Sequence, residues 1–485
     1  MNTPRLTPPT IGPPGRRTVL DDTHIGDIHG ALGTVRHNAA PPRSRRGRLL
    51  ALLAIMGPGL IVMAGDNDAG GVATYAQAGQ NYGLTLLWTL LLLIPVLIVN
   101  QEMVVRLGAV TGVGHARLII ERFGRFWGAF SVGDLFILNF LTIVTEFIGV
   151  SLALGYFGVS KYLSVPIAAA ALIALTASGS FRRWERFMYV FVIMNFIAIP
   201  LAIISHPRIG QIVTHAITPG VQGGFGSSSM LLIIAIVGTT VAPWQLFFQQ
   251  SNVIDKRITP RWINYERVDT VIGAIVVILS AAALMVAVSY GLGTTPLHRR
   301  FADAGAVATG LAHTLGSTAG ARFAIALLNA AIIGAAAVTL ASSYAFGDVF
   351  RHPHSLHHGL GQANLFHGSY GAMVTLAAAI VLIPGAPLGT IATACKHSPA
   401  CFCRAQPSFC CCSATTRPCS APGPTPGGST RWPAQSSASS SCSRRSSPPA
   451  RCARTSTSRR WPSSCSERWW WAWAPPRSAS PGIAG

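Results

Sequence analysis

The sequence predicts an all-α, polytopic membrane protein, and three observations lead to that fold class. The 485 residues are 50% apolar and only 11% charged, with a mean hydropathy of +0.43, whereas a soluble domain carries about 25% charged residues. Apolar segments of about 18–25 residues, long enough to cross a bilayer as helices, follow one another through most of the chain. Basic residues concentrate on alternate loops, as the positive-inside rule expects.

Residues 1–48 are predicted to be a disordered cytoplasmic N-terminal arm. They are polar, rich in Pro and Arg, and without the apolar core of a cleavable signal peptide, so none is expected. A short helix at the membrane surface is expected over 21–38. The basic cluster 43–48 is expected to hold the N-terminus in the cytoplasm.

A transmembrane domain of about nine spans is predicted for residues 49–393. The apolar segments place these spans near 49–78, 83–106, 127–156, 162–179, 187–206, 228–252, 268–293, 321–347 and 370–394. Arg and Lys gather in the loops 106–126, 181–186 and 255–267, while the intervening loops carry few charges. This alternation predicts a multi-pass protein of the inner cell membrane with a cytoplasmic N-terminus.

The composition changes abruptly at Ala394. All ten Cys lie beyond this point without the spacing of a zinc site, and 12 Lys and Arg face one acid, so 12 − 1 = 11 of the 21 net charges fall in residues 394–485. The remaining charge lies in short loops, which argues against nucleic-acid binding. One interpretation of this tail is a disordered, low-complexity segment.

The interpretation that we favour for 394–485 is a frameshift in a GC-rich gene. GC-rich codons for the segment from Cys395, read one register over, can encode an apolar, span-like sequence. On this hypothesis the fold is C-terminally incomplete, because the tenth and later spans are lost. Nucleotide sequencing across the codons for Thr390 to Cys395 decides between the two interpretations.

Small and polar residues interrupt the first predicted span. Asp66, Asn67 and Asp68 lie in the middle of the apolar segment, with Gly65 before them and two glycines after Ala69. Irregular backbone at membrane depth survives only in a cavity or inside protein, and acids there are functional by default. The glycines are expected to allow unwound backbone, whose carbonyls would join the carboxylates in binding a hard cation. The alternative is a re-entrant or extracellular loop with solvated acids.

The sixth predicted span is interrupted without any charge. Thr239, Thr240 and Gln245 offer neutral oxygens, and Pro243 leaves carbonyls upstream without their helical partners. An ordinary proline kink is the alternative. Paired interrupted spans are the best sequence pointer to the substrate site of a secondary transporter.

Both breaks resemble those of the Nramp family of divalent-metal transporters. Asp68-Ala69-Gly70-Gly71, which follows Gly57-Pro58, is similar to that family's Asp-Pro-Gly-Asn, and the residues from Thr239 to Trp244 are similar to its Ala-Thr-Val-Met-Pro-His. Further similarity runs through 106–112 and 265–267, and the whole resemblance covers residues 49–393. It implies a LeuT-type inverted-repeat helical bundle with broken first and sixth spans.

Departures from the family pattern change the expected substrate. Ala242 stands where the family has its metal-binding Met, Gly71 where it has Asn, and Trp244 where it has His. Ile143 replaces the proton-relay Asp of the third span, whereas Glu146 is kept. The remaining ligands are oxygens, which suit partly hydrated Mg²⁺. This pattern resembles the Nramp-related magnesium transporters, for which proton coupling is not expected.

Other polar residues in or near the spans carry weaker predictions. Glu146 and Asp134 are candidates for a proton path or vestibule in the third span, and Asn139 either lines that vestibule or bridges helices. Glu102 is expected to form an interfacial ion pair. The His cluster within 352–358 is expected to lie in a solvated loop.

We interpret the chain as a divalent-cation importer that works by alternating access, with Mg²⁺, and also Mn²⁺, bound between the two breaks. The expected metal contacts are Asp68, Asp66, Asn67, Gly65, Thr239, Ala242 and Gln245. No cofactor is expected besides the transported cation. The partners are the divalent ion and the lipid bilayer, and the sequence does not predict an oligomeric state.

Three alternatives fit parts of the pattern. A proton-coupled Mn²⁺/Fe²⁺ symporter of the Nramp type is the first. An amino-acid symporter of the same fold is the second, although such sites bind carboxylates at half-helix N-termini and need no buried acid pair. An inactive, truncated product is the third. An enzyme is not expected, because the spans show no nucleophile with an adjacent base.

Overall fold

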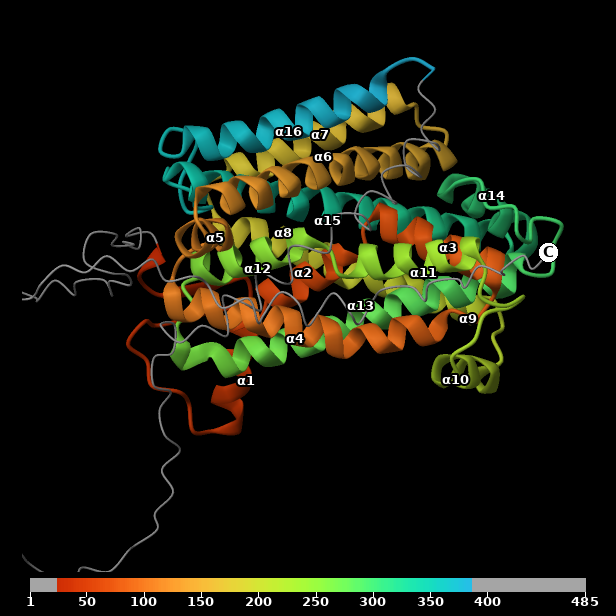
Figure 1. The fold of residues 1–485 in the computed structure, drawn as a ribbon, viewed down its shortest axis with the longest axis horizontal. Coiled ribbons are helices and arrows are strands. Elements are labelled where there is room, and N and C mark those ends of the chain that lie inside the picture. The colour runs from red at the N-terminus through yellow and green to blue at the C-terminus, as the bar shows by residue number, and fades with distance from the viewer. Residues whose placement is uncertain (1–23, 386–485) are drawn as a thin grey trace, which may run out of the picture. The chain divides into compact units, whose positions relative to one another are not determined.

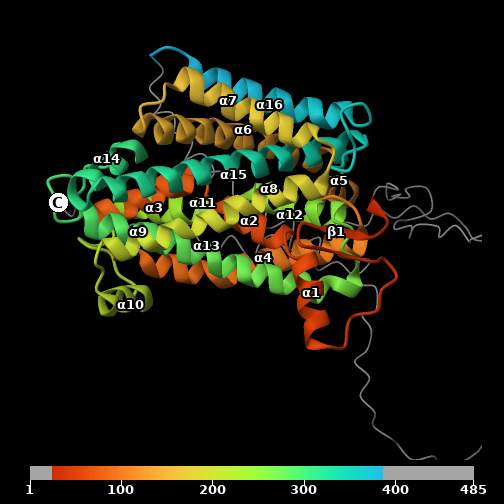
Figure 2. The same ribbon diagram turned by 180° about the vertical axis from the view of Figure 1, so that it is seen from behind.

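The computed structural model describes residues 24–385, which form a bundle of long helices (Figures 1 and 2). Among these residues, seven helices are long and apolar enough to cross a membrane, or eight if the bent pair α1–α2 is one span. The elements are β1 (Ile28–Gly30), β2 (Gly33–Val35), α1 (Arg45–Ile55), α2 (Pro58–Asp66), α3 (Ala69–Tyr82), α4 (Leu87–Thr111), α5 (His115–Phe123), α6 (Arg125–Tyr156), α7 (Lys161–Ala177), α8 (Phe181–Met194), η2 (Asn195–Ile197), α9 (Ala198–Ile204), α10 (Ile209–Ile217), α11 (Ser227–Thr240), α12 (Pro243–Asp255), η3 (Pro260–Trp262), α13 (Ile263–Leu292), α14 (Ala304–Leu315), α15 (Ser317–Phe350) and α16 (Asn364–Leu382).

The described part of the N-terminal arm contains a β-hairpin and the start of α1, so the expectation of disorder, with a helix over 21–38, is wrong there. β1 and β2 pair antiparallel with Ile28 opposite Val35, and both of these side chains are buried. The hairpin packs on α1 so closely that a Cβ at Gly30 would collide with the carbonyl of Ala54. Residues 1–23 lie outside the described part of the chain.

The first predicted span is three helices rather than one. α1 and α2 are bent by 52° relative to each other. The bend occurs at Gly57, whose φ of 147° is readily available only to glycine, and Pro58 then starts α2 at a position where no N–H is needed. α3 continues the span beyond a second interruption.

The other predicted spans each correspond to a helix or a run of helices. The segment 181–204 is a continuous span, so the basic loop predicted at 181–186 is in fact the first turns of α8. The loops contain three helices that the sequence did not predict: α5, α10 and α14. The last predicted span is observed as α16, and the tail from 394 lies outside the described residues.

Two long helices organise the interior of the bundle. α15 is the most buried of the candidate spans, because 83% of its most apolar 18-residue stretch is buried, and it packs along α6. α13 packs against α2, α3 and α4. In Figures 1 and 2, α6, α7 and α16 lie side by side on one flank of the bundle, with α4 and α13 on the other.

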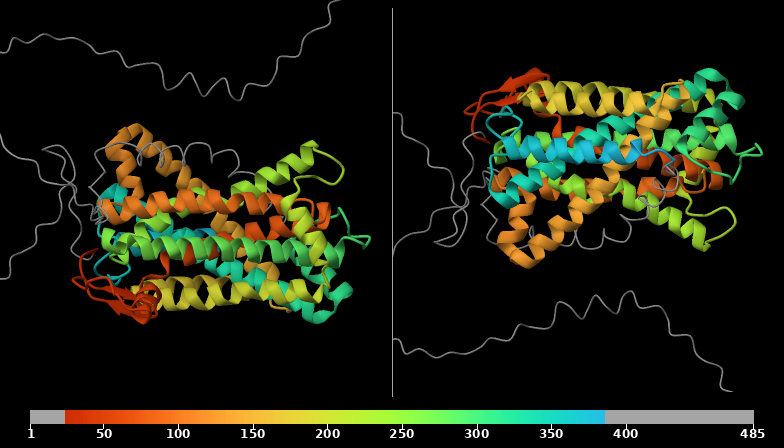
Figure 3. Two further views of the ribbon diagram at one scale, coloured as in Figure 1. Left: turned by 90° about the horizontal axis from the view of Figure 1, so that it is seen from below. Right: turned by 90° about the horizontal axis from the view of Figure 1, so that it is seen from above.

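The bundle has two distinct ends. The hairpin and α1 lie at one end of the helices, and α10 and α14 lie at the opposite end, as the perpendicular views in Figure 3 also show. We call the first the hairpin end. α2 runs from the hairpin end into the middle of the bundle, where the breaks are.

Candidate metal-binding site

Both predicted breaks are real interruptions of helices. In the first span only Asn67 and Asp68 lie outside α2 and α3, and the Asp68 carboxylate caps α3 by accepting the Gly71 N–H at 2.6 Å. In the sixth span α11 ends at Thr240, and α12 restarts at Pro243 after an extended Ala242 (φ −86°, ψ 143°). The second break is therefore more than a kink in one continuous helix.

The glycines at the first break provide space rather than unwound backbone. Gly65 lies within α2 and Gly71 within α3, which corrects the expectation that they would be uncoiled. The two residues outside helices have φ of −78° and −69°, which any residue adopts. A Cβ at Gly65 would lie 3.2 Å from the Trp244 ring, and one at Gly71 would lie 3.1 Å from the Asp66 carbonyl oxygen.

A chain of buried amides joins the two breaks. The Gln245 Nε2 of α12 donates to an Asp66 carboxylate oxygen and, at 3.2 Å, to the Thr240 carbonyl. Its Oε1 accepts from the Gln101 Nε2 of α4 at 3.1 Å. Sequence reasoning missed Gln101, although its place in the polar group Asn100-Gln101-Glu102, inside a long apolar segment, was a signal that could have found it.

Glu146 of α6 lies against the other side of the first break. Its side chain is fully buried, and its Oε2 accepts the Ala69 N–H, one of the first N–H groups of α3, at 3.0 Å. Asp68 is close enough for the two carboxylates to interact electrostatically. Gly334 of α15 makes this approach possible, because a Cβ there would lie within 3 Å of both acidic side chains.

Several oxygen atoms around the first break are available as ligands. Around this break, four buried side-chain oxygens accept no hydrogen bond from the described residues: Asp66 Oδ2, Asn67 Oδ1, Gln101 Oε1 and Glu146 Oε1. The Asn67 amide is held in place by donating to the Val277 carbonyl at 3.2 Å. Buried oxygens without donors are what a hard cation or its water shell requires.

The site is not a preformed cage of strong ligands. Among residues 24–385, no three His, Cys, Asp or Glu side chains come together as a metal cluster. Amide and carbonyl oxygens, together with water, would therefore have to complete the shell of any ion bound there. Mg²⁺ is bound in this way in many proteins, because it gives up its water reluctantly.

The sixth-span residues take unequal parts. The hydroxyl of Thr240 lies 2.9 Å from that of Tyr75, which links α11 to α3. Thr239 is only partly buried, and so is Ala242. The metal contact expected of Thr239 stays a prediction, while Thr240 is tied to Tyr75, which was missed because aromatic residues inside spans are usually packing residues.

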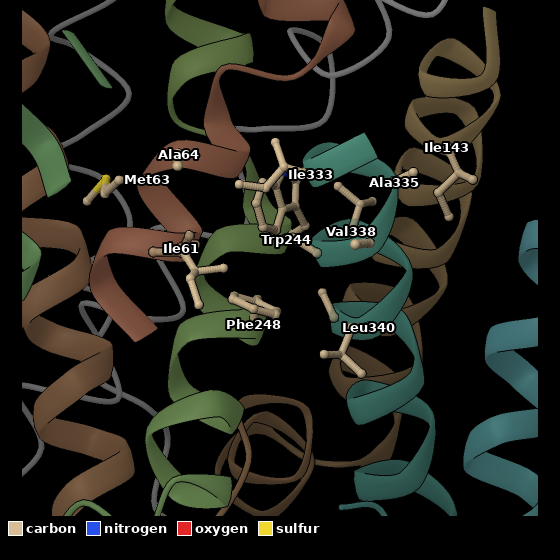
Figure 4. Close-up of a cluster of buried hydrophobic side chains, with 14 of the residues drawn as sticks. Ile61, Met63, Ala64, Ile143, Trp244, Phe248, Ile333, Ala335, Val338 and Leu340 are labelled. Atoms are coloured by element: carbon tan, nitrogen blue, oxygen red, sulfur yellow. The ribbon is translucent and has the colours of Figure 1, made fainter. Parts of the chain in front are cut away.

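An apolar wall stands beside the break. Figure 4 shows Trp244 and Phe248 of α12 between α2 and α15, close to Ile333 and Val338. Ile143 lies on α6 and is fully buried. The positions where the resembled family has His and Asp are therefore occupied here by buried apolar side chains that offer no ligand.

The weaker predictions had mixed outcomes. Asp134 is buried on α6, but it precedes Glu146 by 12 residues, about 18 Å along a helix, so the structure does not bring it to the break. Asn139 bridges α6 and α15 by donating to the Ser342 hydroxyl at 2.8 Å. The ion pair expected of Glu102 is confirmed, with two arginine partners.

The His cluster is more structured than expected. His354 lies 3.1 Å from Asp348, and His357 lies 3.1 Å from the Asp255 carbonyl oxygen. Burial lowers the pKa of His354, but its hydrogen bond to Asp348 and the charge of that carboxylate outweigh burial and raise the pKa to about 9. Burial lowers the pKa of His357. The prediction of a solvated loop is wrong for these two side chains.

Comparisons with known proteins agree with this geometry. A family model described as natural resistance-associated macrophage protein-like, Nramp, matches residues 59–396, which is more than half of the chain. A protein named divalent metal cation transporter MntH from Burkholderia ambifaria is 26% identical over 66% of this chain and 74% of its own length. A protein of the same name from Xanthomonas campestris pv. campestris is 28% identical over 65% of this chain and 73% of its own length.

Solved structures show the same fold. A manganese transporter from Eremococcus coleocola, in complex with an aromatic bis-isothiourea compound, superposes with a TM-score of 0.60 at 19% identity and covers 75% of this chain and 78% of its own. A histidine-to-alanine mutant of that transporter gives a TM-score of 0.61 over 77% of this chain and 79% of its own.

Proposed function

The chain belongs to the Nramp family, and from this premise we propose that its broken-span site carries Mg²⁺ into the cell by alternating access. Members of the family are membrane transporters rather than enzymes, and this chain is a multi-pass divalent metal cation transporter with the LeuT-type fold. Its cargo, its orientation and the residues that hold the ion are our proposal.

The observation that carries the proposal is the chemistry of the atoms around the first break. The unpaired acceptors there are carboxylate and amide oxygens, from Asp66, Asn67, Gln101 and Glu146. Ala242 stands at the second break where the family pattern has a sulfur ligand. Oxygen ligands with room for water suit Mg²⁺, whereas thioether and thiolate sulfur suit softer metals.

Each residue has a distinct part in the proposed site. Asp68 and Asp66 supply two negative charges, which together neutralise a divalent cation. Gln245 holds the Asp66 carboxylate in place and ties it to the sixth span. Asn67 contributes an amide oxygen, and Glu146 anchors the start of α3.

Mn²⁺ is the second candidate cargo, and the comparisons favour it. The relatives are named MntH, and the solved neighbours are described as manganese transporters. Carboxylate, carbonyl and water ligands also suit Mn²⁺. The local site chemistry therefore points to Mg²⁺ and the relatives to Mn²⁺, so the test must measure both ions.

We place the hairpin end in the cytoplasm, in the inner membrane of the cell. The basic segments that follow α4, begin α8 and follow α12 all lie at that end of the helices. Positive segments stay on the cytoplasmic side. Import then means movement of the ion from the α14 end towards the hairpin end.

Uptake into proteoliposomes tests the site. Asp68→Asn is the decisive variant, because Asn remains a good helix cap for α3 while the charge is lost. We expect the wild-type protein to take up Mg²⁺, and Asp68→Asn and Asp68→Ala to take up none. Asp303→Asn, which changes the cap of α14 far from the breaks, is the matched control and keeps uptake.

Three results would contradict parts of this proposal. Strong Mg²⁺ uptake by Asp68→Ala would show that the proposed metal site around Asp68 is wrong. Mn²⁺ uptake without Mg²⁺ uptake would show that Mn²⁺, and not Mg²⁺, is the transported ion. Acidification of the proteoliposome interior driven by Mn²⁺ would favour the proton-coupled symporter. Absence of uptake of either ion by correctly folded wild-type protein would favour an inactive product.

A further inference from the structure

A second buried charge cluster lies between the broken-span site and the hairpin. It consists of Glu185 of α8, Lys256 at the end of α12, and Glu266 and Asp269 of α13, all at most 1% exposed. It meets the first turn of α2, whose Gly59 precedes Asp66 by seven residues, about 10 Å along the helix. The cluster is therefore separate from the proposed metal ligands.

Two of the three carboxylates have hydrogen-bond donors that favour their ionised form. Asp269 Oδ2 accepts three N–H groups from the first turn of α2, including those of Gly57 at 2.9 Å and Gly59 at 2.8 Å. Glu185 accepts from Lys256 Nζ through one oxygen and from the Ala31 N–H of the hairpin through the other. The charge of Lys256 is thus paired with Glu185, and the positive end of the α2 dipole is paired with Asp269.

Glu266 has no such donors. Both of its oxygens are buried, and neither lies at hydrogen-bond distance from a backbone N–H or an ammonium of the described residues. The Gln249 side chain of α12 reaches it. The Gln249 Nε2 donates to the Thr270 hydroxyl at 2.9 Å, and its Oε1 is a buried acceptor without a donor. A proton on Glu266 would supply that donor.

The charge balance leads to the same protonation state. The groups that face Glu266 are Asp269 on its own helix, Glu185 and Tyr189 on α8, and Lys256 at the end of α12. One ammonium cannot offset three buried carboxylates, and a buried carboxylate without a partner takes up a proton instead of remaining charged.

We infer that Glu266 is a proton-binding site, occupied while α2 is docked on α13 and emptied when α2 moves away. The inference rests on the alternating-access function proposed above. α2 is tied to α13 at its first turn and carries Asp66 at its other end, so displacement of α2 changes both sites. Water then reaches Glu266, the carboxyl O–H bond breaks, the proton passes to water, and the carboxylate remains until α2 docks again.

This site differs from the proton relay of the resembled family pattern. That relay uses an Asp of the third span, where this chain has the buried Ile143. Glu266 lies instead on α13, beneath the hairpin. The site makes opening at the hairpin end sensitive to pH on that side of the membrane, whichever divalent cation is carried.

Infrared difference spectroscopy of the purified full chain tests the proton directly. We expect Glu266→Gln to lose one carboxylic-acid C=O band at neutral pH, with thermal stability unchanged because Gln resembles the protonated acid. Glu102→Gln, whose carboxylate is paired with arginines, is the matched control and loses only carboxylate bands. Gln249→Leu removes the proposed acceptor and is expected to shift the band while keeping it.

The infrared spectra can overturn the inference in two ways. Loss of a carboxylate band in Glu266→Gln, in place of an acid band, overturns the inference. If that variant fails to fold, a band unmoved by Gln249→Leu overturns it as well. These measurements need no transport, so they stand even if the cargo proposal fails.

Transport gives the second readout. In proteoliposomes with the pH varied on the hairpin side, wild-type uptake of Mg²⁺ or Mn²⁺ is expected to rise with pH, by at most about tenfold per pH unit for one proton. Glu266→Gln is expected to match the wild type at low pH and to lack the rise. A Glu266→Gln profile that follows the wild type contradicts the inference, whereas no uptake by any variant contradicts the transport proposal alone.

Discussion

Replacing Lys256 by Met is expected to destabilise the protein strongly. Lys256 Nζ donates to Glu185 and to the Met56 carbonyl, and both side chains of the ion pair have no exposed surface. Methionine has a similar length and no charge. The variant therefore leaves the Glu185 carboxylate buried, with only the Ala31 N–H as a donor.

The expected loss follows from this burial. Removing one partner of a buried ion pair costs about 3–5 kcal/mol, because the other charge stays in a medium of low polarity. The pair of Arg106 with Glu102 is the internal comparison, with side chains 54% and 20% exposed. Such a surface pair contributes about 0–1 kcal/mol. The thermal unfolding midpoint of the Lys256 variant should fall by roughly 6–20 °C, since 1 kcal/mol shifts the midpoint of a large domain by about 2–4 °C.

Thermal unfolding in detergent, followed by tryptophan fluorescence, measures the difference. Lys256→Met and Arg106→Met form the matched pair, and Lys256→Met combined with Glu185→Leu removes both buried charges. We expect the double variant to recover most of the lost stability. A Lys256→Met midpoint equal to that of Arg106→Met, or a double variant less stable than the single one, refutes the reasoning.

Three further predictions follow from other contacts. His354→Gln should lower the free energy of unfolding by up to about 3 kcal/mol below pH 6.5 and leave it unchanged above pH 9, since the pKa of His354 rises from 6.5 to about 9 beside Asp348. Unfolding of both proteins across this pH range measures the difference, and a difference that does not change with pH contradicts the prediction. Gly334→Ala places a methyl group 2.8 Å from a Glu146 oxygen, so it should lower the free energy of unfolding by about 1–3 kcal/mol and weaken cation binding in titrations. Unchanged binding argues against the proposed site. Gln245→Leu leaves buried polar partners unsatisfied, so it should lower the free energy of unfolding by about 1–3 kcal/mol and slow cation uptake. Normal uptake would show that the amide chain does not organise the site.

The two breaks could be predicted because their residues conflict with an apolar span. Asp66 and Asp68 cannot lie in hydrocarbon without a purpose, and Pro243 cannot continue a helix without losing a backbone bond. The exact form of the break could not be predicted. Gly65 and Gly71 suggested unwound backbone, but both lie in helices, where the missing side chain leaves room for Trp244 beside Gly65 and for the Asp66 carbonyl beside Gly71.

The buried cluster at the hairpin end was not predictable in the same way. Lys256 belongs to a basic loop in the sequence, and its partner Glu185 is 71 residues away. Asp269 accepts the N–H of Gly57, the residue before α2, which lies 212 residues earlier. Such contacts depend on tertiary packing, which hydropathy and charge alternation do not contain. The same limit applies to the hairpin, whose two three-residue strands are stabilised by packing on α1.

Isothermal titration of Mg²⁺ and Mn²⁺ into the purified protein tests the central claim most directly. The claim is that the cation site between the breaks consists of oxygen ligands around Asp68, without a sulfur ligand at Ala242. We predict that the wild type binds Mg²⁺, that Asp68→Asn does not, and that Ala242→Met shifts the preference towards Mn²⁺. Binding of Mn²⁺ with no detectable Mg²⁺ binding in the wild type, or unchanged Mg²⁺ binding in Asp68→Asn, would contradict the claim.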